Sequence, residues 1–237
     1  MILHKRRLFH VSIETLTPKK GEVAFVWFNN YSGVTIKTPT KTLVVDPADV
    51  DPTVFKTVDA VLVTHEHADH LDESIIRDVH RRTQCPVVAD STSARRLADA
   101  IASDKLFEMR VGKEMKLGNI SIRAEGFNHP ATTPVSYVIT SEDGVRVFHT
   151  GDSLPYPGMK QIGERIPPDV VFCTVGVPAP GASPESGLEI VRLVKPKVAV
   201  PYHGPAVDRK RFAELVAKET PNVKCVVVEQ NKPVKYT

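Results

Sequence analysis

Residues 64–71 read T-H-E-H-A-D-H-L, and this stretch decides the interpretation of the chain. It holds His65, His67, Asp69 and His70 within six residues. An apolar run at 59–64 precedes it and a charged segment follows, which predicts a buried strand, a ligand-rich loop and the start of a helix. Imidazole and carboxylate groups bind Zn, Mn and Fe. Because such groups are costly to bury without a partner, a metal site explains the cluster better than a solvated loop.

The spacing within the cluster favours two metal positions. In an extended segment His65 and His67 point to the same side and can share one cation. Asp69 and His70 follow where the chain turns into the helix, and they can face a second ion about 3.5–4 Å away. The intervening Glu66 is expected to point away from the metals, either to solvent or as a support of the site.

Further metal-binding residue types follow other apolar runs. They are Asp46 after 42–45, His129 after 119–124, Asp152 after 145–149 and His203 after 198–202. A lone aspartate before proline is usually a turn residue, and a lone histidine is usually a satisfied polar group. The recurrence at strand ends favours one shared site instead, since such positions are held by a rigid sheet and still reach solvent.

This order of residues, H-x-H-x-D-H and then histidine, aspartate and histidine at strand ends, resembles the metallo-β-lactamase superfamily over residues 21–227. Within it, the chain is most similar to the branch of L-ascorbate-6-phosphate lactonases and their metal-dependent hydrolase relatives. The supporting strings are V-W-F-N-N-Y-S-G-V-T-I at 26–36, H-T-G-D-S at 149–153, S-P-E at 183–185 and K-P-K-V-A-V-P-Y-H at 195–203. The resemblance implies an α/β fold of the αββα sandwich type, in a single domain over residues 1–237.

The resemblance also implies roles for individual residues. His65, His67 and His129 would hold a first ion, Asp69, His70 and His203 a second, and Asp152 would bridge the two. Asp46 would orient the metal loop without binding metal. One or two divalent ions are expected, with Zn preferred and Mn or Fe as alternatives. Relatives often carry Gly-His where this chain has Asn29-Asn30, so substrate contacts there are expected to differ.

The function implied is a metal-dependent hydrolase that uses a metal-activated hydroxide on a small anionic lactone or ester, with Asp69 and Asp152 as catalytic residues. Asp152 stands where the antibiotic-hydrolysing zinc β-lactamases carry cysteine, which argues against that activity. Two alternatives stay open. One is a phosphodiesterase or nuclease of the same superfamily, and the other is a metal- or ligand-binding protein without turnover.

Composition agrees with a globular enzyme. The chain has 237 residues, of which 41% are hydrophobic and 25% charged, and a net charge of +3 without a dense basic block. We therefore expect a small-molecule substrate and not nucleic acid, and a homo-oligomer stays open. Residues 1–7 form a basic arm without an apolar signal-peptide run, and no membrane segment is predicted. Cys85, Cys173 and Cys225 are far apart in the sequence, which favours a reducing cytoplasm over a disulfide framework.

Hydrophobic patterning by itself predicts a mixed α/β chain. The predicted strands lie near 22–29, 33–38, 42–46, 59–63, 119–125, 135–140, 145–149, 169–173, 197–201 and 223–228. The predicted helices lie near 72–82, 91–102, 157–164, 184–194 and 207–218, with Ser183 as the N-cap of the fourth. Roles stay undecided for His149, for Trp27 and Tyr31 at the mouth of the site, and for Arg95, Arg96, Lys160 and Arg209 as contacts for a substrate phosphate.

Overall fold

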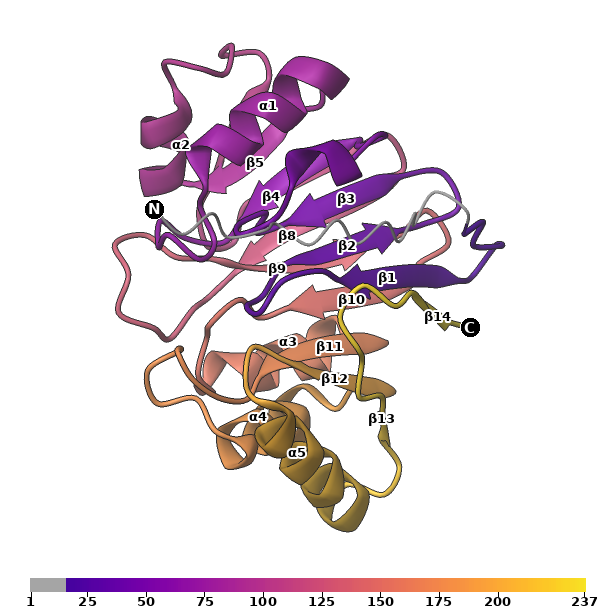
Figure 1. Ribbon diagram of the computed structural model, residues 1–237. Helices are drawn as coiled ribbons and strands as arrows, with labels where there is room; N and C mark the ends of the chain where they lie inside the picture. The colour runs from indigo at the N-terminus through magenta and orange to yellow at the C-terminus, as the bar shows by residue number, and fades with distance from the viewer. Residues whose placement is uncertain (1–15) are drawn as a thin grey trace.

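Two seven-stranded sheets pack face to face, and helices cover their outer faces (Figure 1). The computed structural model describes residues 16–237, so the basic arm predicted at residues 1–7 lies outside the described part. The arrangement confirms the predicted αββα sandwich. Among residues 16–237 no helix is both long and apolar enough to cross a membrane. The single domain and the cytoplasmic location stay predictions.

The first sheet combines an antiparallel half with a parallel half. Its order is β14 (Val234–Tyr236), β1 (Val23–Trp27), β2 (Val34–Lys37), β3 (Thr42–Val45), β4 (Ala60–Val63), β5 (Val87–Asp90) and β6 (Leu106–Met109). Strands β14 to β3 pair antiparallel, and β3 to β6 pair parallel. The residues of β3, β4 and β5 are buried throughout, as expected for parallel strands covered on both faces.

The second sheet repeats this division. Its order is β13 (Lys224–Cys225), β12 (Val198–Tyr202), β11 (Val170–Thr174), β10 (Arg146–His149), β9 (Ser136–Thr140), β8 (Ile120–Glu125) and β7 (Glu114–Leu117). Strands β10 to β13 pair parallel, and β7 to β10 pair antiparallel. Burial alternates along β8, so one of its faces packs on the core and the other is partly exposed.

The helices divide between the two sheets. They are α1 (Glu73–Thr83), α2 (Ser91–Leu97), α3 (Gly158–Arg165), α4 (Pro184–Val194) and α5 (Ala206–Glu219), with a short 3₁₀ turn, η2 (Pro52–Val54). Helices α1 and α2 pack on the first sheet, and α3 to α5 pack on the second (Figure 1). A third apolar cluster, which includes Phe25 and Phe172, fills the space between the sheets. The strand ends that carry the site are therefore anchored from both sides.

Local sequence explains where several elements begin. Asp72 caps α1 by accepting hydrogen bonds from the backbone N–H groups of Ser74 and Ile75. Ser183 caps α4 in a capping box with Ser186, as predicted for that position. The hairpin turn between β9 and β10 is closed by a bond from the Gly144 N–H to the Ser141 carbonyl at 3.0 Å.

The sequence did not predict four of the strands, and it predicted one helix too long. Strands β5, β6, β7 and β14 were not predicted, and α2 ends at Leu97 instead of near residue 102. The four apolar or mixed residues of β5 are too few to show a period, and they become a strand through pairing with β4 and β6. Strand β7 is half exposed at a sheet edge, so its sequence lacks the burial signal of an inner strand.

Candidate metal centre

The predicted ligands lie in loops that open at one edge of the two sheets. They follow β4 (His65, His67, Asp69 and His70), β8 (His129), β10 (Asp152) and β12 (His203), and the predicted supporting residue Asp46 follows β3. The carboxyl ends of parallel strands meet at the same edge of a sheet, which is where ligands bind in α/β folds. The structure gathers the predicted ligands into two groups, one of three residues and one of four. The groups are adjacent, because the rings of His65 and His70 are 4.0 Å apart.

The first group consists of three imidazole nitrogens. Nδ1 of His67 lies 3.1 Å from Nε2 of His65 and 3.1 Å from Nε2 of His129. A tetrahedral ion with nitrogen ligands at about 2.0–2.1 Å holds those nitrogens roughly 3.3 Å apart, so the spacing fits one zinc-sized ion. His65 is fully buried, whereas His67 and His129 are half-buried and face the opening of the site.

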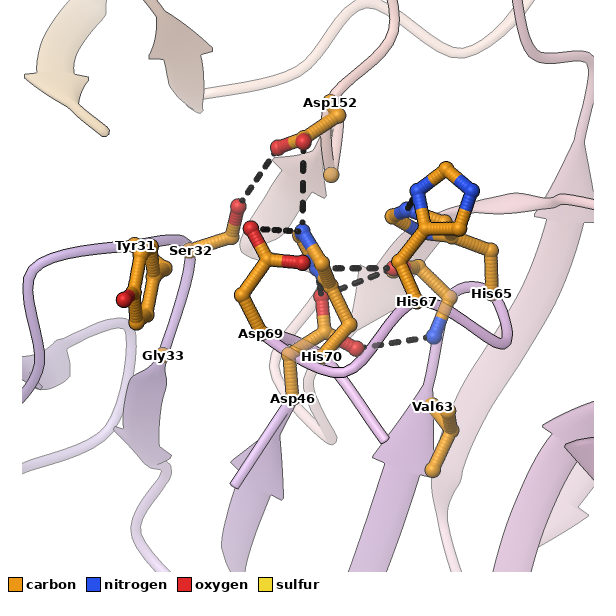
Figure 2. Close-up of polar contacts among 12 residues, drawn as sticks. Tyr31, Ser32, Gly33, Asp46, Val63, His65, His67, Asp69, His70 and Asp152 are labelled. Atoms are coloured by element: carbon orange, nitrogen blue, oxygen red, sulfur yellow. Dashed lines mark hydrogen bonds and ion pairs between the residues drawn. The ribbon is translucent and has the colours of Figure 1, made fainter. Parts of the chain in front are cut away.

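The second group combines two imidazoles with two carboxylates. Nε2 of His70 and Nε2 of His203 each lie 3.2 Å from an oxygen of Asp152 and 3.6 Å from Oδ2 of Asp69. Figure 2 shows the carboxylates of Asp69 and Asp152 directed at the same nitrogen of His70. Only Asp69 is appreciably exposed, with 25% of its side chain accessible. The bridging role predicted for Asp152 stays a prediction.

Within residues 16–237, several buried ring nitrogens at the site have no hydrogen-bond partner. They are Nε2 of His70, Nδ1 of His129 and both ring nitrogens of His203. The Asp152 oxygens at 3.2 Å lie off the hydrogen-bond direction of the nearby nitrogens. An unsatisfied buried polar group costs about 1–3 kcal/mol, so these atoms are poorly explained by protein contacts alone. A divalent cation would satisfy Nε2 of His70 and Nε2 of His203, which face the second group, and this His/Asp donor set suits Zn, Mn or Fe.

Asp46 orients one histidine in each group. Its Oδ2 lies 2.8 Å from Nδ1 of His70, so that nitrogen carries the hydrogen and Nε2 is free to bind metal. The Thr64 hydroxyl donates to the same Oδ2 at 2.8 Å. Having used its one hydrogen, that hydroxyl can only accept from Nδ1 of His65 at 3.0 Å, which frees Nε2 of His65. These contacts are the ones that the predicted supporting role of Asp46 requires.

Both Asp46 and His203 adopt left-handed backbone conformations, with φ of 50° and 49°. Such conformations are uncommon for residues other than glycine and cluster at functional sites. The Asp46 turn is held by hydrogen bonds from the Thr64 N–H and side chain. The backbone strain at Asp46 is therefore offset by contacts that connect the ends of β3 and β4.

Asp152 is positioned through Ser32 and His149. The Ser32 hydroxyl donates to Oδ1 of Asp152 at 3.1 Å, and Nε2 of His149 donates to the Ser32 carbonyl at 2.8 Å. The Gly151 N–H donates to Nδ1 of His149 at 3.2 Å. His149 is fully buried and both of its nitrogens are used, so it is a support of the Asp152 loop and no metal ligand.

Asn29 has a structural role that the sequence did not reveal. Its side-chain nitrogen donates to the Ala48 carbonyl at 2.9 Å, and its oxygen accepts from the N–H groups of Tyr31 and Gly33 at 3.0 and 2.8 Å. These bonds shape the loop between β1 and β2 and connect it to the loop that carries Asp46. Asn30 is exposed and accepts from the Gln230 side chain at 2.9 Å.

Burial and charge shift the pKa values of the two groups in opposite directions. Burial, with the positive charge of His70, lowers the pKa of His65 well below its usual value. Burial also acts to lower the pKa of His70, but the charges of Asp152 and Asp46 outweigh it and raise that pKa well above the usual value. Burial acts to raise the pKa of Asp152, but the charge of His70 outweighs it and lowers that pKa well below the usual value. Burial thus favours neutral imidazole at His65, whereas the carboxylates of the second group favour positive charge at His70.

The structure shows the surroundings of the other residues that the sequence singled out. Trp27 is buried, and the Tyr31 ring lies 5.7 Å from the His203 ring at the mouth of the second group. Glu66 points away from the metal positions and accepts from the N–H and hydroxyl of Thr132. Of the four basic residues, Arg96 pairs with Glu73 and Lys160 with Glu164, while Arg95 and Arg209 line cavities.

Two residues of the site were missed in the sequence. Thr64 transmits the Asp46 hydrogen bond to His65, and Ser32 holds Asp152. A hydroxyl residue directly before the first histidine of the cluster was a usable signal for Thr64. Ser32 is 120 positions from Asp152, and no local pattern connects them.

Comparison with known proteins agrees with this architecture. A family model for the β-lactamase superfamily domain matches residues 33–204. The chain belongs to this superfamily. A UPF0173 metal-dependent hydrolase from Caldivirga maquilingensis is 31% identical over 190 residues, which cover 75% of this chain and 82% of the relative. This chain is therefore one of the UPF0173 metal-dependent hydrolases.

Solved structures show the same fold for this superfamily member. Igni18, a metallo hydrolase from Ignicoccus hospitalis, has a TM-score of 0.78 at 22% identity, with 91% of this chain and 99% of that one covered. A diphosphatase from the PhnP family has a TM-score of 0.65 at 15% identity, with 91% and 97% covered. The family model confirms the predicted superfamily, and these two likenesses confirm the predicted fold alone.

Proposed function

We propose that this metal-dependent hydrolase cleaves a small anionic lactone or ester, as the resemblance to L-ascorbate-6-phosphate lactonases suggests. The observation that carries the proposal is a cavity of about 570 Å³ that opens beside the second group, between Tyr31 and Gly204. Pockets of about 300–1,000 Å³ take small molecules. Gly204 follows His203 directly in the chain, and the Tyr31 ring lies 5.7 Å from the His203 ring, so the cavity lies next to the second group.

The proposed ligand roles follow the two groups. His65, His67 and His129 hold one ion, and Asp69, His70, Asp152 and His203 hold the other, with zinc preferred over manganese or iron. Bound ions of this kind lower the pKa of a coordinated water and polarise a carbonyl oxygen. Asp46 keeps His65 and His70 in the tautomers that present Nε2 to the ions.

Asp69 is the proposed proton carrier. Burial acts to raise its pKa, but the nearby imidazoles of His203 and His70 outweigh this and lower the pKa below its usual value. The carboxylate is therefore ionised at neutral pH and can accept a proton. Because Asp69 is the exposed member of the second group, it can pass that proton to the leaving oxygen or to solvent.

The charge pattern supports a small substrate over nucleic acid. The net charge is only +3. On α1, next to the cluster loop, Arg77, Arg81 and Arg82 each pair with a carboxylate of the same helix. Nucleic acid binding depends on several unpaired Lys and Arg contacts to phosphates, and paired cations serve this poorly.

The test is a comparison of substrates with protein loaded with Zn or Mn. We expect hydrolysis of γ-lactones or aryl esters at a kcat/KM above that for bis-nitrophenyl phosphate or single-stranded RNA. The Asp152→Ala variant is the control for contaminating activity. Turnover of phosphodiesters with no hydrolysis of lactones and esters would contradict the proposal and would show that the protein cleaves phosphodiesters. Two bound ions with no turnover of any substrate would favour a binding protein.

A further inference from the structure

The cavity beside the second group has one basic residue, Arg209, in its lining. Its lining comes from segments that are distant in the sequence: Trp27, Asn30, Tyr31, Val177, Pro178, Gly204, Pro205, Ala206, Arg209, Glu229 and Gln230. Tyr31 and Gly204 form the side nearest the metal cluster, and Figure 2 shows Tyr31 on the Asp69 side of it. Arg209 enters from the second turn of α5.

The Arg209 guanidinium is held in place and is not neutralised. Its Nη1 donates to the Val228 carbonyl at 2.8 Å, and the group lies 4.7 Å from the centre of the Trp27 ring. Nε is buried without a hydrogen-bond partner, and in the described part of the chain no carboxylate lies within ion-pair distance of Arg209. A guanidinium has five N–H donors, so most of them stay available.

Arg209 is the charged residue in the cavity lining that could bind an anion. Glu229 also lines the cavity, but its carboxylate is 71% exposed and pairs with Lys232 at 2.6 Å. Burial lowers the pKa of Arg209, which reflects the cost of holding its charge away from water. An anionic ligand group would offset that cost.

A second cavity, beside the first group, is less suited to an anion. Its lining includes Arg95 and Arg110. Arg110 pairs with Glu108 at 2.8 Å, and Arg95 is an exposed side chain that donates to Thr92. Arg209 is held between a backbone carbonyl and an aromatic ring, and neither Arg95 nor Arg110 is held in this way.

Part of the lining of the Arg209 cavity is apolar. Val177 is 70% exposed there, next to Pro178, Pro205 and Ala206. Asn30 and Gln230 hydrogen-bond to each other at 2.9 Å and form a polar rim. The walls thus suit a ligand with a short carbon chain that ends in an anionic group.

We propose that Arg209 binds the carboxylate or phosphate of the substrate and so determines its specificity, while the bond to be cleaved lies at the metal cluster. The inference rests on the proposed function for the reaction, but the binding of the anion to Arg209 can be measured separately. The matched variants are Arg209→Met and Lys210→Met, because Lys210 is the exposed neighbour on α5 and each variant removes one positive charge.

Binding is measured through Trp27, the only tryptophan of the chain, which lies against Arg209. Titration of the metal-loaded protein with succinate and, in a separate arm, inorganic phosphate should change its fluorescence to saturation. Arg209→Met should weaken binding of the preferred anion about 10- to 100-fold, and Lys210→Met less than about twofold. The arm with the lower Kd identifies carboxylate or phosphate. Absence of binding in both arms, or an equal loss in both variants, would overturn the proposal.

Catalysis gives a second readout with two matched esters. Mono-p-nitrophenyl succinate differs from p-nitrophenyl butyrate by a terminal carboxylate, so the ratio of their KM values isolates recognition of the charge. Arg209→Met should shift this ratio about tenfold or more against the succinate ester, and Lys210→Met should not. An unchanged ratio would overturn the role of Arg209 while the hydrolase function stands. If neither ester is cleaved, the proposed ester hydrolysis fails, and the Trp27 titration still decides the anion site.

Arg209→Met could also disturb packing, because the side chain contacts Trp27 and Val228. Arg209→Lys keeps the charge, and it should bind the anion with an affinity between those of the original protein and Arg209→Met. A Lys variant as weak as the Met variant, in a protein with an unchanged melting temperature, would show that the charge is not what the anion recognises and would contradict the proposal.

Discussion

Oδ2 of Asp46 lies 2.8 Å from Nδ1 of His70, and both side chains are fully buried. The contact connects the end of β3 to the helix-proximal end of the metal loop. It also fixes which nitrogen of His70 is free, because an ionised carboxylate accepts hydrogen bonds and cannot donate them. The Thr64 hydroxyl extends the same control to His65. One aspartate thus orients a histidine in each of the two groups.

Asp46→Asn should weaken metal binding about 10- to 100-fold without unfolding the protein, because a neutral amide holds the two histidine tautomers less firmly. The measurement is a competitive titration of each variant with a zinc chelator of known affinity. Asp49→Asn is the control, since Asp49 is an exposed residue of the same loop. Equal zinc affinity in Asp46→Asn and the original protein would contradict the orienting role.

Asp152→Ala should remove at least one bound ion and lower turnover by more than about 100-fold, a larger effect than for a residue that acts through a ligand. The reason is that His70 and His203 both face its carboxylate at 3.2 Å. Elemental analysis and kcat measure the two effects. Ser32→Ala removes the bond to Oδ1 but keeps the carboxylate itself, and it should give a smaller loss in both. Full metal content and turnover in Asp152→Ala would refute the ligand assignment.

The residues of the two groups could be picked out from the sequence because each carries a signal in its own segment. His65, His67, Asp69 and His70 share one loop, and His129, Asp152 and His203 each follow a recognisable apolar run. Such residues carry a signal by type and position even when their partners are unknown.

The supporting contacts could not be predicted, because they depend on the pairing of distant segments. Thr64 reaches Asp46 only because β3 and β4 pair in a parallel register that places Val45 opposite Leu62. Ser32 meets Asp152 only after the two sheets have packed. The edge strand β7 likewise depends on its neighbour β8 and not on its own pattern.

Removal of metal should lower the melting temperature. Without an ion, Nε2 of His70 and both ring nitrogens of His203 have no hydrogen-bond partner among the described residues. An ion at about 100 times its Kd stabilises the folded state by about 2.7 kcal/mol. Thermal unfolding with EDTA and then with added Zn or Mn measures this. A melting temperature that responds to neither treatment would argue against an assembled metal site.

Gly151→Ala should destabilise the protein and reduce turnover together. Gly151 has a φ of +56°, and an added Cβ would lie 2.8 Å from the Phe127 side chain. The left-handed conformation alone costs an alanine about 1–2 kcal/mol. The contact with Phe127 adds to this and displaces the loop that carries Asp152. Gly144→Ala is the matched control, because Gly144 has a φ of +87° with nothing within 4 Å of its added Cβ. Denaturant unfolding and kcat should therefore show a stability loss in both variants and a turnover loss in Gly151→Ala alone, and equal turnover in the two would contradict the proposed coupling.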